Sequence, residues 1–166
     1  MPILLADAHA QYKDHLLSVG KAEATVTAYT KDVEQLVNFV GKQGKTQIDE
    51  VSADDIQEFK DLLEKQRYTG KSISRKINSI KSFFRFMVSQ GEVDSNPAMD
   101  IQHPKYETVP PRVLSKIEYR ALRDSSRGDE RMYAIIEILL QTGMRISELA
   151  NLKLEDVDLE RNILDI

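Results

Sequence analysis

Few residues of this chain could do covalent or metal chemistry. Its 166 residues contain no cysteine, which excludes a thiol nucleophile, a disulfide scaffold and zinc or iron–sulfur sites with thiolate ligands. The three histidines, His9, His15 and His103, are scattered and do not have the spacing of metal ligands. What remains is the chemistry of hydroxyl groups and of cationic side chains, which bind phosphate.

The basic residues are concentrated in one stretch. The chain has 23 basic and 27 acidic residues, and its net charge of −4 alone argues against a polyanionic partner. Residues 65–91 nevertheless hold seven basic side chains, and all 27 acidic residues lie outside them. Such segregation indicates an electrostatic footprint for nucleic acid.

Helical periodicity places much of this charge on one face. A helix over about 72–89 would bury Ile73, Ile77, Ile80, Phe84 and Met87 and turn Lys71, Arg75, Asn78, Ser82 and Arg85 to the opposite side. We expect these five polar residues, together with Lys76 and Lys81, to bind DNA. An ordinary solvated helix surface is the alternative.

Three further helices are predicted before this one. Apolar stripes indicate a helix over about 4–18 and a second that carries Val26 to Val40 and ends at Gly41 and Gly44. A third begins after Ser52, which has Asp55 three residues later and is typical of a helix N-cap. In the first stripe the apolar residues are Leu5, Ala8, Tyr12, Leu16 and Val19. The chain is therefore expected to be mainly helical.

A proline-rich stretch separates these helices from the rest. Four of the five prolines lie within residues 96–112, and we predict a linker over 97–112. Beyond it, Ser115 and Glu118 form a capping-box pattern that opens a helix to about residue 125. A helix over about 130–141 ends at Gly143, a short helix follows, and residues 162–166 read as a strand without a partner. We therefore expect the second domain to be incomplete.

No apolar run approaches the ~20 residues that span a bilayer. The apolar run at the amino terminus is too short for a signal peptide, and an acidic residue follows it too early. We expect a cytoplasmic protein without a membrane partner.

One segment carries a specific family resemblance. Thr142-Gly143-Met144-Arg145 with Glu148-Leu149, followed by Leu152 and Asp156-Val157-Asp158, resembles the tyrosine recombinases of the phage-integrase and Xer type. Supporting residues elsewhere are Thr25, Tyr29, Asp32, Phe39, Arg75, the run Phe83 to Phe86, Asn96-Pro97, Pro104-Lys105, Leu114-Ser115 and Glu118.

The resemblance implies a four-helix core-binding (SAM-like) DNA-binding domain at 1–96 and the amino-terminal part of an α+β catalytic domain at 113–166. Such enzymes break and rejoin DNA through a tyrosine, without a metal or nucleotide cofactor. The implied partners are a double-stranded recombination site and further recombinase protomers, in a nucleoid-associated cytoplasmic location. The resemblance also implies that two helices hold the DNA. Lys21, Thr27 and Lys31 flank the polar side of the second helix, and contact between these residues and DNA phosphates is a further expectation.

Of the family's catalytic groups, only the first arginine is matched. Arg145 would bind the non-bridging oxygens of the scissile phosphate. Glu148 either orients it or forms an ordinary surface pair three residues away. No histidine is followed by the family's His-x-x-Arg pattern, and all six tyrosines precede Arg145. We expect a truncated chain that binds DNA and does not cut it.

Two other functions remain open at this point. One is a naturally short regulator that occupies recombination sites or pairs with a full-length recombinase. The other is a helical protein-interaction domain whose partner binds the basic face.

Overall fold

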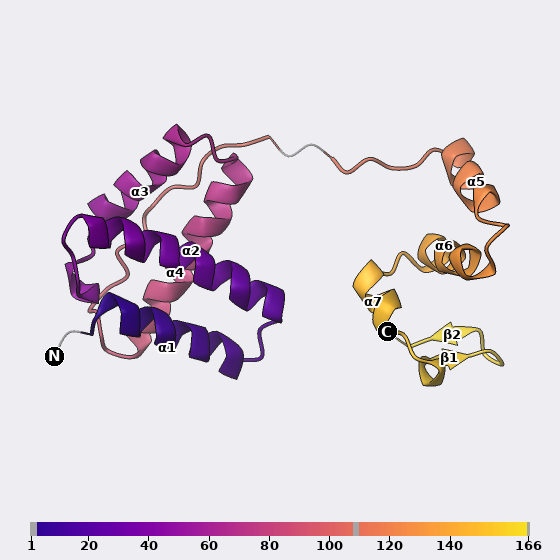
Figure 1. The fold of residues 1–166 in the computed structure, drawn as a ribbon, viewed down its shortest axis with the longest axis horizontal. Coiled ribbons are helices and arrows are strands. Elements are labelled where there is room, and N and C mark those ends of the chain that lie inside the picture. The colour runs from indigo at the N-terminus through magenta and orange to yellow at the C-terminus, as the bar shows by residue number, and fades with distance from the viewer. Residues whose placement is uncertain (1–2, 108–109, 166) are drawn as a thin grey trace. The chain divides into compact units, whose positions relative to one another are not determined.

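A computed structural model of the protein describes residues 3–107 and 110–165 (Figure 1). The chain divides into two compact units, residues 1–108 and 109–166. Among the described residues, no helix is both long enough and apolar enough to cross a bilayer.

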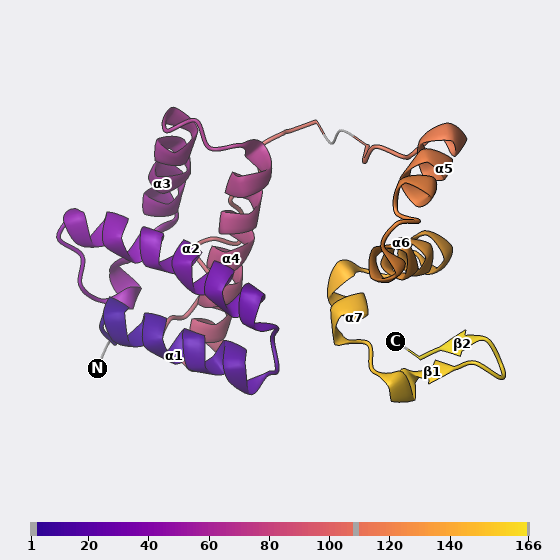
Figure 2. The same cartoon turned by 45° about the vertical axis from the view of Figure 1, so that its right-hand side comes forward.

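The first unit is built from four helices. They are α1 (Leu5–Ser18), α2 (Glu23–Lys42), α3 (Ala53–Lys65) and α4 (Gly70–Ser89), with a 3₁₀ turn at Ile48–Glu50. A short turn makes α1 and α2 antiparallel neighbours, α2 packs along α4, and α3 closes against both (Figures 1 and 2). The expected mainly helical fold is confirmed.

The predicted apolar stripes meet in one core. Tyr12, Phe83 and Phe84 are fully buried, and the Tyr12 and Phe83 rings pack edge to face with their centroids 5.3 Å apart. Because Phe83 and Phe84 are fully buried, their rings pack in the core and are not available to stack on bases. The prediction that Val19 belongs to the buried stripe of the first helix is wrong. Val19 is 51% exposed because α1 ends at Ser18 and the chain turns away there.

The start of α3 forms as its sequence predicts. The Asp55 N–H donates to Ser52 Oγ at 3.3 Å, and the Ser52 N–H donates to Asp55 Oδ2 at 2.7 Å. This reciprocal capping box satisfies N–H groups that have no partner within the helix.

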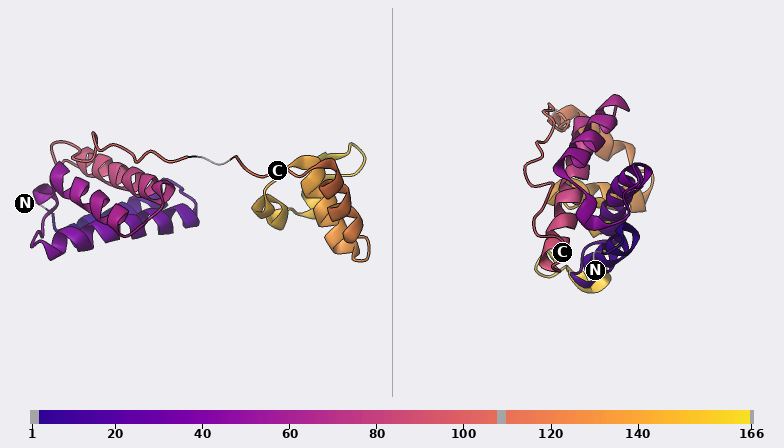
Figure 3. Two further views of the ribbon diagram at one scale, coloured as in Figure 1. Left: turned by 90° about the horizontal axis from the view of Figure 1, so that it is seen from above. Right: turned by 90° about the vertical axis from the view of Figure 1, so that its left-hand side faces the viewer.

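After α4 the chain runs back along that helix (Figure 3). Asn96 donates to the Lys81 carbonyl at 3.0 Å, and the Ser74 hydroxyl lies 2.9 Å from His103 Nδ1. At the far end Gly70 leaves room for Tyr106, whose Cβ would lie 2.7 Å from any Cβ added at that glycine. Ala98 and Ile101, inside the stretch predicted as a linker, are buried in the first unit's core.

The second unit consists of short elements. Helices α5 (Lys116–Ser125), α6 (Glu130–Thr142) and α7 (Ile146–Asn151) are followed by a 3₁₀ turn at Leu154–Asp156 and by strands β1 (Val157–Asp158) and β2 (Ile163–Leu164). The predicted capping box of Ser115 and Glu118 is present at the start of α5. Among the described residues of this unit, Met144 is the one buried apolar side chain.

The predicted strand near residue 163 has a partner, so the expectation of a lone strand is wrong. β2 pairs with β1 in antiparallel register, with Val157 opposite Leu164. The tight return is possible because Asn162 adopts the left-handed region at φ 56° and Asp158 Oδ1 accepts the N–H groups of Glu160 and Arg161. Ile166, the last residue of the predicted strand, lies outside the described residues.

Candidate nucleic-acid interface

One side of α4 is exposed, basic and free of carboxylates. Lys71, Arg75, Asn78 and Arg85 are exposed, and Lys81 and Ser82 are half-buried at its margin. Thr69 is the N-cap of α4, and its hydroxyl accepts the Ser72 N–H at 3.2 Å, so Lys71 lies in the first turn of the helix. We name the exposed side chains of Lys71, Arg75, Asn78 and Arg85 the basic face.

Lys76 is not part of the basic face. Its side chain is only 5% exposed, and its ammonium donates to Asp32 Oδ1 at 2.9 Å and to Gln35 Oε1 at 2.7 Å. The same ammonium lies 5.3 Å from the centre of the Tyr68 ring. The physical reason is position: Lys76 lies three residues after Ile73 and four before Ile80, on the apolar stripe.

Asp32 of α2 is the centre of a buried polar cluster. It is 1% exposed and accepts hydrogen bonds from three α4 side chains, those of Arg75, Lys76 and Ser79. The Ser79 hydroxyl lies 2.9 Å from Asp32 Oδ2. A buried carboxylate with three donors and two cationic partners is fully compensated.

Arg75 joins this cluster to the surface. Its Nη1 donates to Asp32 and lies 3.4 Å from the carbonyl oxygen of Ala28, while 45% of the side chain remains exposed. A guanidinium has five N–H donors, so the donors on Nη2 and Nε have no part in these contacts.

The residues expected from the second helix are also accessible. Thr27 and Lys31 are exposed on α2, and Lys21 is exposed in the turn before it. Because α2 packs along α4, Thr27 and Lys31 lie on the helix next to the one that carries the basic face, and Lys21 lies in the turn that leads into α2.

Sequence reasoning missed Asp32 and Ser79 as parts of the site. A signal was present: Asp32 lies three residues after Tyr29 and four before Leu36, so it falls on the apolar stripe of its helix. An acidic residue on one stripe and a lysine on another predict a buried pair wherever the two helices pack together.

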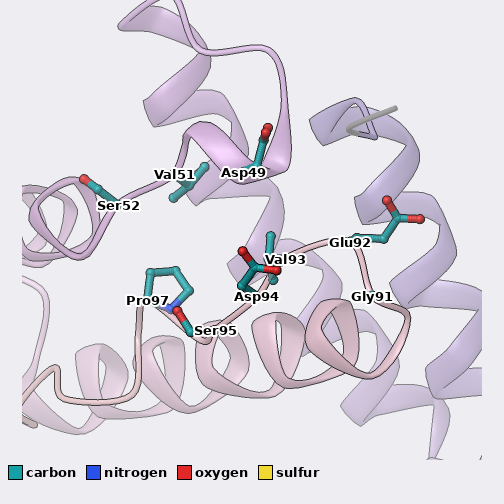
Figure 4. Close-up of a pocket in the computed structure, with 9 residues that line it drawn as sticks. All are labelled: Asp49, Val51, Ser52, Gly91, Glu92, Val93, Asp94, Ser95 and Pro97. Carbon is teal, nitrogen blue, oxygen red and sulfur yellow. The ribbon is translucent and has the colours of Figure 1, made fainter.

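A hollow of about 590 Å³ lies elsewhere on the first unit, between the start of α3 and the chain after α4 (Figure 4). Its carboxylates, Asp49, Glu92 and Asp94, are spread around it rather than directed at one point. Among the described residues, no group of three or more histidine or acidic side chains could hold a metal ion.

The segment around Arg145 is explained by local contacts. Thr142 Oγ1 donates to the Ile138 carbonyl at 2.7 Å and accepts the Met144 N–H at 3.2 Å. Gly143 ends α6 in the left-handed region at φ 69°, and Met144 turns inward. The result is that Arg145, at the start of α7, projects outward with 81% of its side chain exposed.

Glu148 binds both ends of Arg145. Its Oε2 accepts the Arg145 backbone N–H and its Oε1 accepts from Nη1, each at 2.6 Å. The backbone hydrogen bond, followed by the side-chain one, holds the pKa of Glu148 below its ordinary value. The contact is an exposed pair three residues apart that also caps α7, and it leaves further guanidinium donors available.

Both units match one protein family. Residues 10–91 match the family described as "Phage integrase, N-terminal SAM-like domain", and residues 112–166 match "Phage integrase family". The chain belongs to the phage integrase family of tyrosine recombinases.

Named relatives agree with this family. The chain is 34% identical over 143 residues to "Tyrosine recombinase XerC" of Roseiflexus sp., covering 83% of this chain and 46% of that protein. It is 31% identical over 154 residues to "Tyrosine recombinase XerD" of Rickettsia bellii, covering 89% and 50%. The chain thus spans about half the length of the curated relatives it matches.

Solved structures share the fold. A lambda integrase tetramer bound to a Holliday junction matches with a TM-score of 0.71 at 17% identity, over 95% of this chain and 46% of that one. The Tn1549 transposon integrase in complex with a circular intermediate DNA matches with a TM-score of 0.67 at 23% identity, over 95% and 50%. The fold class expected from the sequence, a SAM-like helical domain followed by part of a catalytic domain, is confirmed.

Proposed function

We propose that the first unit binds duplex DNA through the basic face of α4, with the polar side of α2 beside it, as the site-recognition part of a tyrosine recombinase. The observation that carries this proposal is the exposure of Lys71, Arg75, Asn78 and Arg85 along one helix side, within a stretch that has no acidic residue. The relatives that are bound to DNA support it, and one of them is a tetramer, so further protomers are expected partners.

The side chains of the basic face divide into two groups. Arg75 and Asn78, at the centre, suit the edges of guanine and adenine in the major groove, where a good bidentate contact discriminates by ~1–3 kcal/mol. Lys71 and Arg85, near the ends, are placed to bind phosphates, which position the protein without reading sequence. Lys76 is left out of the proposal because its ammonium is buried against Asp32.

In the second unit we propose that Arg145 binds the scissile phosphate. Its exposed guanidinium keeps donors beyond the one given to Glu148, enough to reach the non-bridging oxygens. Because no tyrosine follows Arg145 in these 166 residues, the chain by itself is expected to bind DNA without cleaving it.

Salt dependence tests the basic face directly. The slope of log K against log salt is negative for DNA binding. In the double variant Lys71→Ala, Arg85→Ala this slope should become less steep by about 0.9 for each phosphate that the protein no longer neutralises. A matched control, Lys13→Ala with Lys42→Ala, removes the same charge from exposed positions on α1 and α2. Equal slopes for the two doubles, with helical circular dichroism retained, would contradict the proposal and favour a protein partner.

Covalent chemistry is tested separately. The chain is incubated with a nicked duplex that traps a phosphotyrosine, and the products are run on a denaturing gel. We expect a mobility shift under native conditions and no protease-sensitive band on the denaturing gel. An adduct would show that one of the six tyrosines, or another nucleophilic side chain of this chain, can attack the phosphate.

A further inference from the structure

The contact between Asp32 and Arg75 links the interior of the first unit to its basic face. Among residues 3–107 and 110–165, every group within hydrogen-bond distance of the Asp32 carboxylate comes from α4: Arg75, Lys76 and Ser79. On the α2 side, Gln35 binds the Lys76 ammonium and the Ala28 carbonyl lies near Arg75 Nη1. The cluster thus has two cations and one carboxylate.

The excess of one cation over the carboxylates of the cluster affects the charge at the protein surface. Lys76 is buried, and its ammonium is paired with the Asp32 carboxylate. The second cation, Arg75, uses the same carboxylate while 45% of its side chain is exposed, so the excess positive charge of the cluster is presented at the surface.

The anchoring also removes conformational freedom. A free surface arginine samples many rotamers and loses them when it binds a partner. Here Nη1 is held by a carboxylate that is itself buried at the junction of two helices, and the guanidinium plane is oriented before any DNA arrives.

We propose that Asp32 is a specificity-determining positioning residue: from the interior it holds the Arg75 guanidinium in the orientation that reads DNA. This inference rests on the proposed function. Pre-ordering one long side chain is expected to strengthen binding of a preferred duplex about 2- to 13-fold, with little effect on a scrambled duplex.

A pair of variants separates positioning from stability. Lys76→Met removes the buried ammonium and leaves Asp32 bound to Arg75. Adding Asp32→Leu makes the buried part of the cluster apolar, a replacement that folded proteins often tolerate without loss of stability, and releases Arg75. The single Asp32→Leu variant is avoided because it would leave Lys76 buried and uncompensated.

Binding is measured with the full chain on a duplex enriched from a random pool by the wild-type protein and on a scrambled duplex of the same composition. K76M should bind the enriched duplex as wild type does, because Lys76 is buried away from the basic face and Asp32 still holds Arg75 in this variant. The variant D32L/K76M should lose the 2- to 13-fold preference. The variant R75A, in which Lys76 still compensates Asp32, and the triple variant R75A/D32L/K76M, in which no buried charge remains, should bind the enriched duplex equally.

A second readout does not depend on DNA. Nitrogen-15 NMR of the Arg75 guanidinium should show restricted rotation in wild type and K76M and free rotation in D32L/K76M, with circular dichroism reporting that all three are folded. If wild type fails to bind either duplex, the proposed function itself fails. If wild type binds and R75A weakens it, but D32L/K76M equals K76M, only the role of Asp32 is overturned.

Discussion

The two units bury their apolar residues to very different extents. In the first, 21 described apolar side chains are buried in one cluster drawn from all four helices. In the second unit, Met144 is the one buried apolar side chain among the described residues. Ile117 and Leu154 of this unit are 80% and 87% exposed.

The difference does not come from local signals. Both units have a serine-initiated capping box, and both have helices that begin and end close to the predicted residues. The first unit has two helices of 20 residues whose stripes face each other, whereas the helices of the second have 10, 13 and 6 residues. Capping defines where a helix ends, but only packing against other elements buries its apolar side.

The largest expected effect is a cavity in the first unit. Phe84→Ala should lower the free energy of unfolding by ~3–5 kcal/mol because Phe84 is fully buried. Ile138→Ala, in the half-exposed α6, should cost less. Hydrogen exchange, read separately for residues of each unit, gives both values. A loss for Ile138→Ala as large as that for Phe84→Ala would mean that the second unit has a comparable core.

A backbone effect is expected next, in the second unit. Gly143 has φ 69°, so Gly143→Ala should destabilise the junction of α6 and α7 by ~1–2 kcal/mol. Gly128→Ala is the control, because an added Cβ there meets nothing within 4 Å and the backbone is not in the left-handed region. Faster exchange at α6 and α7 in the Gly143 variant alone is the expected result.

The two capping boxes allow a direct comparison. Ser52→Ala and Ser115→Ala should each cost ~1 kcal/mol, the usual value for a helix N-cap. The loss should be greater at Ser52, whose hydroxyl also lies 2.7 Å from the buried Asp55 carboxylate. Amide hydrogen exchange in α3 and α5, followed at increasing urea concentration, measures both losses. A greater loss at Ser115 would show that burial around the cap is unimportant.

The smallest effect is on pH dependence. Burial acts to raise the pKa of Asp55, but hydrogen bonds from Lys45 and Ser52 outweigh it and lower that pKa. The Ser115 backbone N–H, then the Ser115 and Arg112 side chains, lower the pKa of Glu118. A lowered pKa stabilises the fold above the ordinary value, ~4, and the contribution disappears as pH falls through the folded value.

The first unit should therefore lose stability below about pH 4 in a way that Asp55→Asn abolishes. Asp54→Asn, at the exposed neighbouring position, is the control. Urea midpoints followed by circular dichroism between neutral and acidic pH measure the effect. The change for Glu118→Gln should be smaller, because water screens that carboxylate. An unchanged pH dependence in the Asp55 variant would rule out its ionised contacts as the cause.

The sequence alone determined the helices, their caps, the apolar stripes and the segregation of basic residues, because each depends on residues within a few positions of one another. It also located Thr142 to Glu148, whose geometry is made by hydrogen bonds inside that segment. Periodicity places Lys76 and Asp32 on the apolar stripes of their helices, but only the tertiary structure decided that the two side chains meet. α2 brings Asp32 and Gln35 against one side of α4, where they hold the Lys76 ammonium, while Lys71 stays exposed. Pairing over more than 40 residues depends on how two helices pack, and periodicity within either helix does not contain that information.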